Sequence, residues 1–285
     1  MGRLALFVAA LLTTGGAARA QTVAQPPAST LAAAPATPSP AELPPICTDR
    51  PVKANLPCTV PAGHFQYEAD VFNATVAHQD GATTDLFLLT NPTLKYGLTP
   101  SLDVEANISP YEVLRTRTDA GAGSVISGVG DLYLRLKYEF LDVPGFPVQA
   151  AIIPYIKVPT ARMGLGNGAV EGGLLAPIGY SLSPSITLDL MPEIDNYIDA
   201  AGGGRHLNTS QILGLAVSVP RAITLYAEMW GDWNFDPAGT VRQYSADVAA
   251  SIGVTRTLQF DAGLNLGLNR QTPGFQGYFG VSQRF

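Results

Sequence analysis

Charged side chains alternate with apolar ones in several stretches of this 285-residue sequence, and the alternation limits the chemistry they can do. In Gly128–Leu141, which reads GVGDLYLRLKYEFL, Asp131, Arg135, Lys137 and Glu139 all occupy odd-numbered positions, whereas the even-numbered positions are apolar. Carboxylates gathered on one surface attract cations and repel anions, and interleaved bases tune that preference. The pattern therefore predicts a surface that selects ions or small solutes.

The elements that would hold these side chains are β-strands, because successive side chains of a strand point to opposite faces. The same alternation recurs in SLDVEANIS, ITLDLMPEID, ITLYAEMWGD and TLQFDAGLNLGLN. It places further acidic side chains on the polar face, namely Asp103, Glu105, Asp189, Glu193, Glu228 and Asp261. Together with the four charged residues above, these are our candidate lumen and selectivity residues.

About twelve such segments follow one another from His64 onward, and the links between them alternate in length. Proline-containing short turns such as GLTPS and LSPS alternate with longer stretches such as 115–127 and 160–169. Short turns at one rim and long loops at the other are typical of bacterial outer-membrane barrels. We therefore predict an all-β chain that forms a transmembrane antiparallel β-barrel of about 12 strands over residues 63–285. Its apolar face would meet lipid and its charged face the lumen.

Composition supports this fold class. Charged residues make up 14% of the chain, below the roughly 25% of soluble domains, and hydrophobic residues make up 46%. The apolar residues are dispersed by alternation, so a helical membrane protein is disfavoured. A soluble β-sandwich is the alternative, but it would rarely combine so little charge with so many long alternating strands. The net charge of −6 also disfavours nucleic acid as a partner.

The N-terminus indicates export. Residues 1–20 have a basic start, an apolar run and an A-x-A cleavage site, which predicts a signal peptide. Its removal would take away Arg3 and Arg19, so the net charge would fall from −6 to −8. Residues 21–45 are rich in Pro and Ala and carry one charge, which predicts a disordered linker.

The two cysteines follow the linker, in residues 46–62, which we expect to be a periplasmic segment ahead of the first strand. In an exported chain, Cys47 and Cys58 most simply form a disulfide. A metal site is disfavoured here, because His64 is the only other candidate ligand nearby. We expect no metal, cofactor or catalytic residue elsewhere either, since the three histidines lie far apart in sequence.

The chain ends in GYFGVSQRF, an alternating final strand with Phe285 at its terminus. A terminal Phe resembles the signal by which bacterial barrels are recognised for assembly. We expect the assembly machinery and the lipid of the outer membrane of a Gram-negative bacterium to be partners of this chain.

Two stretches resemble a known family. GVGDLYLRLKYEF resembles the G-x-G-D-x-x-L-x-x-K-Y motif of the phenol-degradation MetA-pathway outer-membrane barrels, and CTDRPVKANLPCTVPAGHFQYEAD resembles the N-terminal block of one branch of that group. The resemblance implies a porin-like transporter, sometimes linked to hydrophobic aromatic compounds, and it brings no established catalytic residues.

The sequence-based hypothesis is therefore a channel for passive uptake or efflux of small solutes, including aromatic or hydrophobic compounds, and not an enzyme. Two alternatives stay open. Acid–base pairs could plug the lumen and leave a structural barrel, because twelve strands fall between eight, which side chains can fill, and sixteen, which leave a channel. A lipid-acting enzyme would use His206, Asn208 and Ser210, which share one strand face, but a polar strand start explains that motif more simply.

Overall fold

The computed structural model describes residues 43–285, so the predicted signal peptide and most of the predicted linker lie outside the described residues. The described chain contains sixteen strand segments. These are β1 (Phe65–Gln79), β2 (Ala82–Leu88), β3 (Asn91–Thr99), β4 (Leu102–Ile108), β5 (Glu112–Thr118), β6 (Gly123–Gly128), β7 (Leu132–Asp142), β8 (Val148–Val158), β9 (Glu171–Leu175), β10 (Ile178–Ser183), β11 (Ile186–Ile198), β12 (Arg205–Val219), β13 (Ile223–Asn234), β14 (Val241–Gly253), β15 (Leu258–Gly267) and β16 (Phe275–Arg284). Within these residues, no helix is long and apolar enough to span a membrane.

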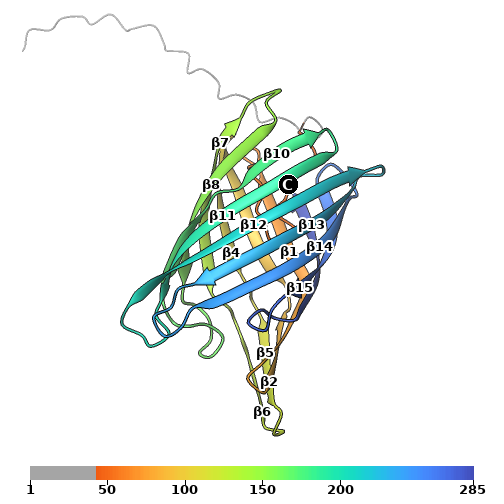
Figure 1. The fold of residues 1–285 in the computed structure, drawn as a ribbon. Coiled ribbons are helices and arrows are strands. Elements are labelled where there is room, and N and C mark those ends of the chain that lie inside the picture. The colour runs from red at the N-terminus through yellow and green to blue at the C-terminus, as the bar shows by residue number, and fades with distance from the viewer. Residues whose placement is uncertain (1–42) are drawn as a thin grey trace, which may run out of the picture. The chain divides into compact units, whose positions relative to one another are not determined.

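All strands belong to one closed antiparallel barrel (Figure 1). Neighbouring strands of the wall pair antiparallel in chain order, once segments of the same interrupted strand are counted together, and β16 closes the sheet by pairing with β1 from Gln66 opposite Arg284 to Val76 opposite Phe275. Four of the strands are interrupted, so β2 continues into β3, β4 into β5, β6 into β7 and β9 into β10. The sixteen segments therefore make twelve wall strands, which confirms the predicted fold and strand number. Closure leaves no unpaired sheet edge to face lipid.

Three of the interruptions lie side by side in neighbouring strands. The backbone N–H of Leu89 donates to the carbonyl of Tyr111, and that of Gly130 donates to the carbonyl of Ser109, which links the three breaks. Beyond them, β2, β5 and β6 continue as a narrow stranded extension, visible at the bottom of Figure 1. The expectation of an irregular stretch over 115–127 was therefore wrong, because most of these residues form β5, β6 and their turn.

The outer face is apolar where the alternation predicts it. On β7, Leu134, Leu136, Tyr138 and Phe140 are exposed outward, whereas Lys137 and Glu139 between them are buried in the barrel. An apolar outer band around a polar interior is the arrangement of a barrel immersed in lipid.

Replacing Leu134 by Arg is expected to lower the free energy of unfolding in lipid by about 2–4 kcal/mol, because a guanidinium then faces hydrocarbon. Leu182→Arg is the matched control, since Leu182 is also exposed outward but lies one residue from the end of β10. There we expect a cost of about 0–1 kcal/mol, as at a membrane interface. Urea titration of the barrels refolded into vesicles measures both. Equal unfolding free energies for the two variants would show that the face bearing Leu134 does not meet lipid.

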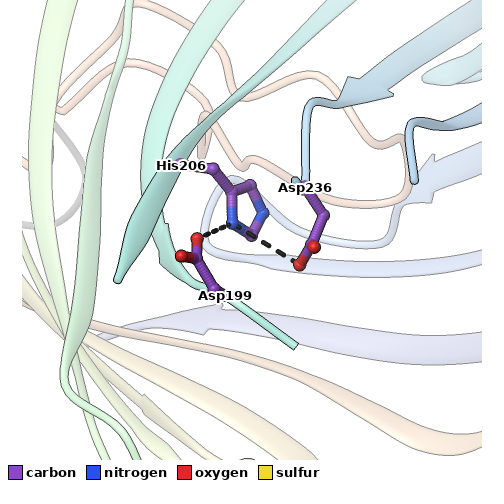
Figure 2. Close-up of side chains that lie close together, drawn as sticks. All are labelled: Asp199, His206 and Asp236. Carbon is purple, nitrogen blue, oxygen red and sulfur yellow. Dashed lines mark hydrogen bonds and ion pairs between the residues drawn. The ribbon is translucent and has the colours of Figure 1, made fainter. Parts of the chain in front are cut away.

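The two rims differ as predicted. Tight turns such as 219–223 form one rim, here called the short-turn rim, and longer connections such as 158–171 and 234–241 form the long-loop rim. Both ends of the barrel domain lie at the short-turn rim, where the N–H of Phe285 donates to the carbonyl of Phe65 (2.8 Å). At the long-loop rim, side chains of two neighbouring loops approach each other around His206 (Figure 2).

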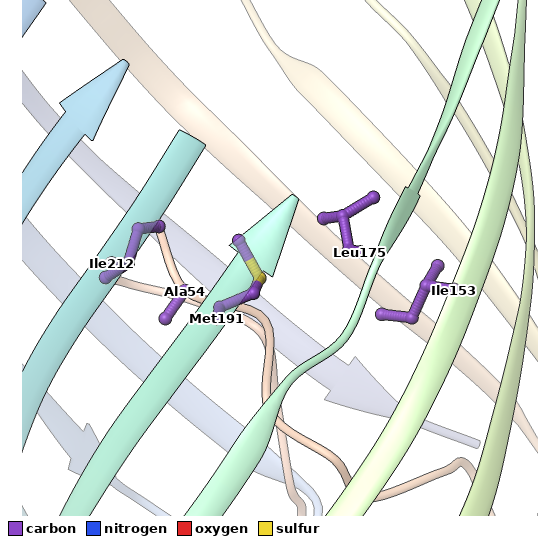
Figure 3. Close-up of a cluster of buried hydrophobic side chains, with 5 residues drawn as sticks. All are labelled: Ala54, Ile153, Leu175, Met191 and Ile212. Carbon is purple, nitrogen blue, oxygen red and sulfur yellow. The ribbon is translucent and has the colours of Figure 1, made fainter. Parts of the chain in front are cut away.

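The buried apolar core lies inside the barrel and is small. Ile153, Leu175, Met191 and Ile212 project inward from adjacent strands, and Ala54, from the segment before β1, packs among them (Figure 3). Ile153 and Ala54 are 0% and 1% exposed. A residue that precedes the first strand in sequence is therefore a core residue of the barrel.

Candidate functional site

Residues 46–62, here called the inner segment, lie inside the lumen and contact opposite parts of the barrel wall. The N–H groups of Lys53 and Ala54 donate to the carboxylate of Glu228 on β13 (2.9 and 3.3 Å). The N–H of Val60 donates to Asp103 on β4 (2.8 Å). The expectation of a periplasmic segment ahead of the barrel therefore needs correction: these residues enter the barrel, because its wall carries the partners for their polar groups.

The disulfide closes this segment into a loop. Cys47 and Cys58 are bonded, with Cα atoms 6.5 Å apart, which confirms the predicted disulfide. Inside the loop, the N–H of Leu56 donates to Asp49 (2.9 Å). A covalent loop loses less conformational entropy on docking than an open chain, so the disulfide favours one defined conformation in the lumen.

Asp49 is the anchor of the inner segment on one side of the wall. The ammonium of Lys137 on β7 lies 2.7 and 2.8 Å from its two carboxylate oxygens, and the ammonium of Lys95 on β3 also donates to it. Glu68 and Glu105 complete the cluster at 2.7 and 3.6 Å from the Lys95 ammonium. Both lysine side chains are almost fully buried, so these charges rely on their ion pairs rather than on water.

Arg50 and Lys53 are the anchors toward another part of the wall. Arg50 makes a two-pronged contact with Asp261 on β15 (3.2 and 2.7 Å) and a further bond to Asp70 on β1 (2.5 Å). The Lys53 ammonium lies 2.8 Å from Asp247 on β14. The planar guanidinium suits paired carboxylate oxygens, so Arg50 fixes the position of the segment as well as neutralising the wall.

The inner segment lies inside the lumen, and there are cavities toward both rims. A cavity of about 560 Å³ opens at the short-turn rim beside the disulfide, lined in part by Glu139 and Arg284. Another of about 480 Å³ lies at the long-loop rim. A smaller one of about 160 Å³ lies between Arg50, Lys53 and the wall. The arrangement is that of two vestibules separated by a docked loop.

The structure places most of the predicted lumen residues around this loop. Asp103, Lys137, Glu228 and Asp261 contact it directly, as described above. Arg135 lies 3.9 Å from Glu105, within the same charged cluster. Of the other candidates, Glu139 is buried beside the disulfide cavity, Asp189 is buried, and Glu193 is half-buried and accepts a hydrogen bond from Ser210 (3.1 Å).

Asp131 has a positioning role. Its carboxylate accepts a hydrogen bond from the N–H of Ala161 (2.9 Å) and lies 3.5 Å from the Lys157 ammonium. It therefore holds the start of the 158–171 connection against the wall, and its close partner is Lys157. The carboxylate of Glu112 lies close to Gly130 next to it, so a side chain at position 130 would have to displace the end of the Glu112 side chain.

Sequence reasoning did not identify the three charged residues of the inner segment, Asp49, Arg50 and Lys53. The sequence indicates their role only indirectly. The predicted lumen wall carries more acidic than basic side chains, and Arg50 and Lys53 lie between two cysteines in a chain that is poor in charge. An excess of buried carboxylates requires cations from elsewhere in the chain, which these two residues supply.

The geometry does not bring together a hydrolase triad from His206, Asn208 and Ser210. All three lie on the inward series of β12, whereas Leu207 between them is 52% exposed on the outside. The Nδ1 of His206 pairs with Asp199, and the hydroxyl of Ser210 donates to Glu193. An activated serine needs a hydrogen bond to its base, and Ser210 is bonded to another group.

Comparisons with known proteins agree with this fold. The sequence model of a family described as "Putative MetA-pathway of phenol degradation" matches residues 48–285. Among solved structures, the COG4313 outer membrane channel from Pseudomonas putida F1 is similar over 82% of this chain and 100% of that chain, with a TM-score of 0.66 and 18% identity. The beta domain of the Bordetella autotransporter BrkA is similar over 79% and 100%, with a TM-score of 0.51 and 12% identity. Curated protein sequences give no significant match.

Proposed function

The chain belongs to the family described as the putative MetA-pathway of phenol degradation, and from that premise we propose that it is an outer-membrane channel for small solutes, constricted by its own inner segment. The short-turn rim faces the periplasm, as in outer-membrane barrels generally, and the exposed apolar face meets lipid. The terminal Phe285 serves the assembly machinery. The proposal assigns transport to the barrel and no enzymatic activity.

The observation that carries the proposal is the pair of vestibules, about 560 and 480 Å³, on either side of one docked loop. A barrel built only for structure has no need of cavities at both rims. The loop is held to the wall by hydrogen bonds and buried ion pairs, and water that enters the lumen can solvate these charged groups when the loop undocks. The inner segment can therefore limit passage without sealing the barrel permanently.

The solute class is proposed from the family description and from an aromatic pair that faces the barrel interior. The family description names phenol degradation. Tyr133 and Tyr155 lie with ring centroids 6.1 Å apart on the inward series of β7 and β8. Paired aromatic rings offer stacking surfaces to a small aromatic solute. We propose phenol-sized aromatic compounds as solutes, with the carboxylates of the selectivity candidates, Asp103, Glu105 and Glu228 among them, disfavouring anions.

Single-channel recording of the refolded barrel in a planar bilayer tests the proposal. We expect small conductance steps and a reversal potential that indicates cation preference in a KCl gradient, because carboxylates outnumber bases on the lumen wall. Swelling of vesicles in a neutral phenolic solute measures solute passage directly. If gel migration shows that the barrel is folded and it passes neither ions nor solute, the result would support the alternative of a plugged structural barrel. The docked loop also favours that alternative.

A further inference from the structure

His206, Asp199 and Asp236 form a compact group at the long-loop rim, on the opposite side of the inner segment from the disulfide cavity. Asp199 lies in the turn between β11 and β12, His206 is the second residue of β12, and Asp236 follows β13. Figure 2 shows the imidazole between the two carboxyl groups. We propose that this group binds a divalent transition-metal cation of the zinc class and thereby ties the β11–β12 turn to the β13–β14 loop.

The spacing of the three groups fits such an ion. The Nδ1 of His206 lies 2.9 Å from Oδ1 of Asp199 and 3.6 Å from Oδ2 of Asp236, and one ligand atom from each residue lies within 4.8 Å of the others. Ligand atoms at 2.0–2.1 Å from a tetrahedral ion are about 3.4 Å apart. The two distances from His206 Nδ1, 2.9 and 3.6 Å, lie on either side of this spacing of about 3.4 Å. Small side-chain rotations therefore bring the three ligand atoms to coordination distance.

The second observation is the unused capacity of the histidine. The side chain of His206 is 5% exposed, and its Nε2 is buried without a hydrogen-bond partner among residues 43–285. Nδ1 faces the two aspartates and is the proposed ligand atom, and because Nε2 has no partner, the ring can turn toward an ion without breaking a hydrogen bond at Nε2. The cavity of about 480 Å³ at this rim is lined by His206 and by both aspartates, which gives an ion from the outside a route to the ring.

The charges of the group suit a cation. The N–H groups of Ala200 and Ala238 donate to the Asp236 carboxylate (both 2.7 Å) and hold it in place beside the imidazole. Two carboxylates and a neutral imidazole balance the charge of a divalent ion, and one imidazole with two carboxylates is a donor set that zinc accepts.

Other charged side chains near the site are engaged with other partners, so they do not compete for the proposed ligands. The Glu171 carboxylate is paired with the Lys157 ammonium at 2.6 Å. Arg205 donates to the backbone carbonyls of Val170 and Asn196, so its guanidinium is engaged away from the two aspartates. The expectation of no metal site considered only the histidines, which are far apart, and this group uses one histidine with acids from two loops.

Calorimetric titration of the folded, detergent-solubilised barrel with ZnCl₂ tests the proposal, and the ligand-field spectrum with Co²⁺ reports the donor atoms. We expect one ion per chain, with the affinity lowered at least tenfold in both His206→Ala and Asp236→Asn. His78→Ala is the matched control, because His78 is exposed near the end of β1, away from the site, with Thr83 of β2 as its partner. It should bind like the unaltered chain.

Binding is also expected to weaken as the pH falls, because protons compete with the metal for its ligand atoms. Heat-modifiable migration on a gel shows whether each variant is folded, and Asp236→Asn keeps the test valid if His206→Ala does not assemble. Absence of a one-to-one binding step in the unaltered chain would overturn the proposal. So would equal zinc affinity in the chain and in both folded site variants.

Discussion

Deleting residues 47–58 is expected to raise the single-channel conductance several-fold while leaving the barrel closed. The deleted residues contribute no strand to the wall, because β1 begins at Phe65 and pairs with β16 and β3 through its own backbone. What the deletion removes is the loop that separates the two vestibules. Water then fills the space and solvates the carboxylates and lysines that the loop had paired.

The deletion should also change ion preference in a defined direction. The deleted residues carry two cations, Arg50 and Lys53, and one anion, Asp49. The lumen therefore becomes more negative by one charge, and Asp70 and Asp261 become available to passing ions. The reversal potential in a salt gradient should move further toward the cation limit.

A control deletion of equal length, residues 23–34, lies outside the described residues and removes no charged side chain. It should leave conductance and reversal potential unchanged. If the 47–58 deletion folds by gel shift and conducts no better than the unaltered chain, the constriction must lie elsewhere, and the wall itself would have to limit passage.

The barrel could be predicted from the sequence because its determinants are local. On β7, the odd positions Arg135, Lys137 and Glu139 face inward and the even positions Leu134 and Leu136 face outward, as the two-residue period requires. The division into a short-turn rim and a long-loop rim could be predicted for the same reason, because connection lengths are read directly along the chain. Such patterns are repeated along the chain, so one misjudged segment does not change the fold class.

The docked loop could not be predicted, because its determinants are not local. Arg50 meets Asp261 across 211 positions in sequence, and Asp49 meets Lys137 across 88. The inner segment has no periodicity that could indicate a partner, and its prolines disfavour a strand. The same limit applies at the long-loop rim, where Asp236 approaches His206 only because β13 lies beside β12.

The strand interruptions were also missed, for a different reason. The break at Leu89 and Thr90 follows four consecutive apolar residues, Leu86 to Leu89, so the two-residue period does not show where the strand is interrupted. Thr90 adopts a positive φ of 64°, and the two neighbouring strands are interrupted at the same level. A break shared by three strands is a property of the sheet, and it can be seen only once the pairing is known.

Replacing Arg50 by Met is expected to release the inner segment from the wall. The side chains of Asp70 and Asp261 are 5% and 0% exposed in contact with Arg50, so the substitution leaves two buried carboxylates without their cation. Removing one partner of a buried ion pair costs about 3–5 kcal/mol. The barrel can avoid that cost by undocking the loop and letting water reach both acids, which shifts the docking equilibrium by a factor of about 10² or more.

Cleavage by a lysine-specific protease measures the release. The chain has four lysines, and Lys95, Lys137 and Lys157 lie within β3, β7 and β8, so Lys53 is the one outside a strand. Cleavage after Lys53 falls between the bonded cysteines, so the two pieces separate on a gel only after reduction. We expect the unaltered chain to resist and Arg50→Met to be cut much faster, with a band shift that requires reductant.

Two further variants separate loss of the ion pair from general damage. Adding Asp70→Asn and Asp261→Asn to Arg50→Met removes the unpaired charges, so the loop should dock again and cleavage should slow. Arg117→Met breaks a comparable pair with Asp85, but Arg117 is 56% exposed, and such pairs contribute about 0–1 kcal/mol. Arg117→Met should therefore not change the rate of cleavage after Lys53. If Arg50→Met remains resistant, the lysine cluster around Asp49 and the contacts of Ala54 hold the loop without Arg50, and the constriction is a fixed part of the barrel.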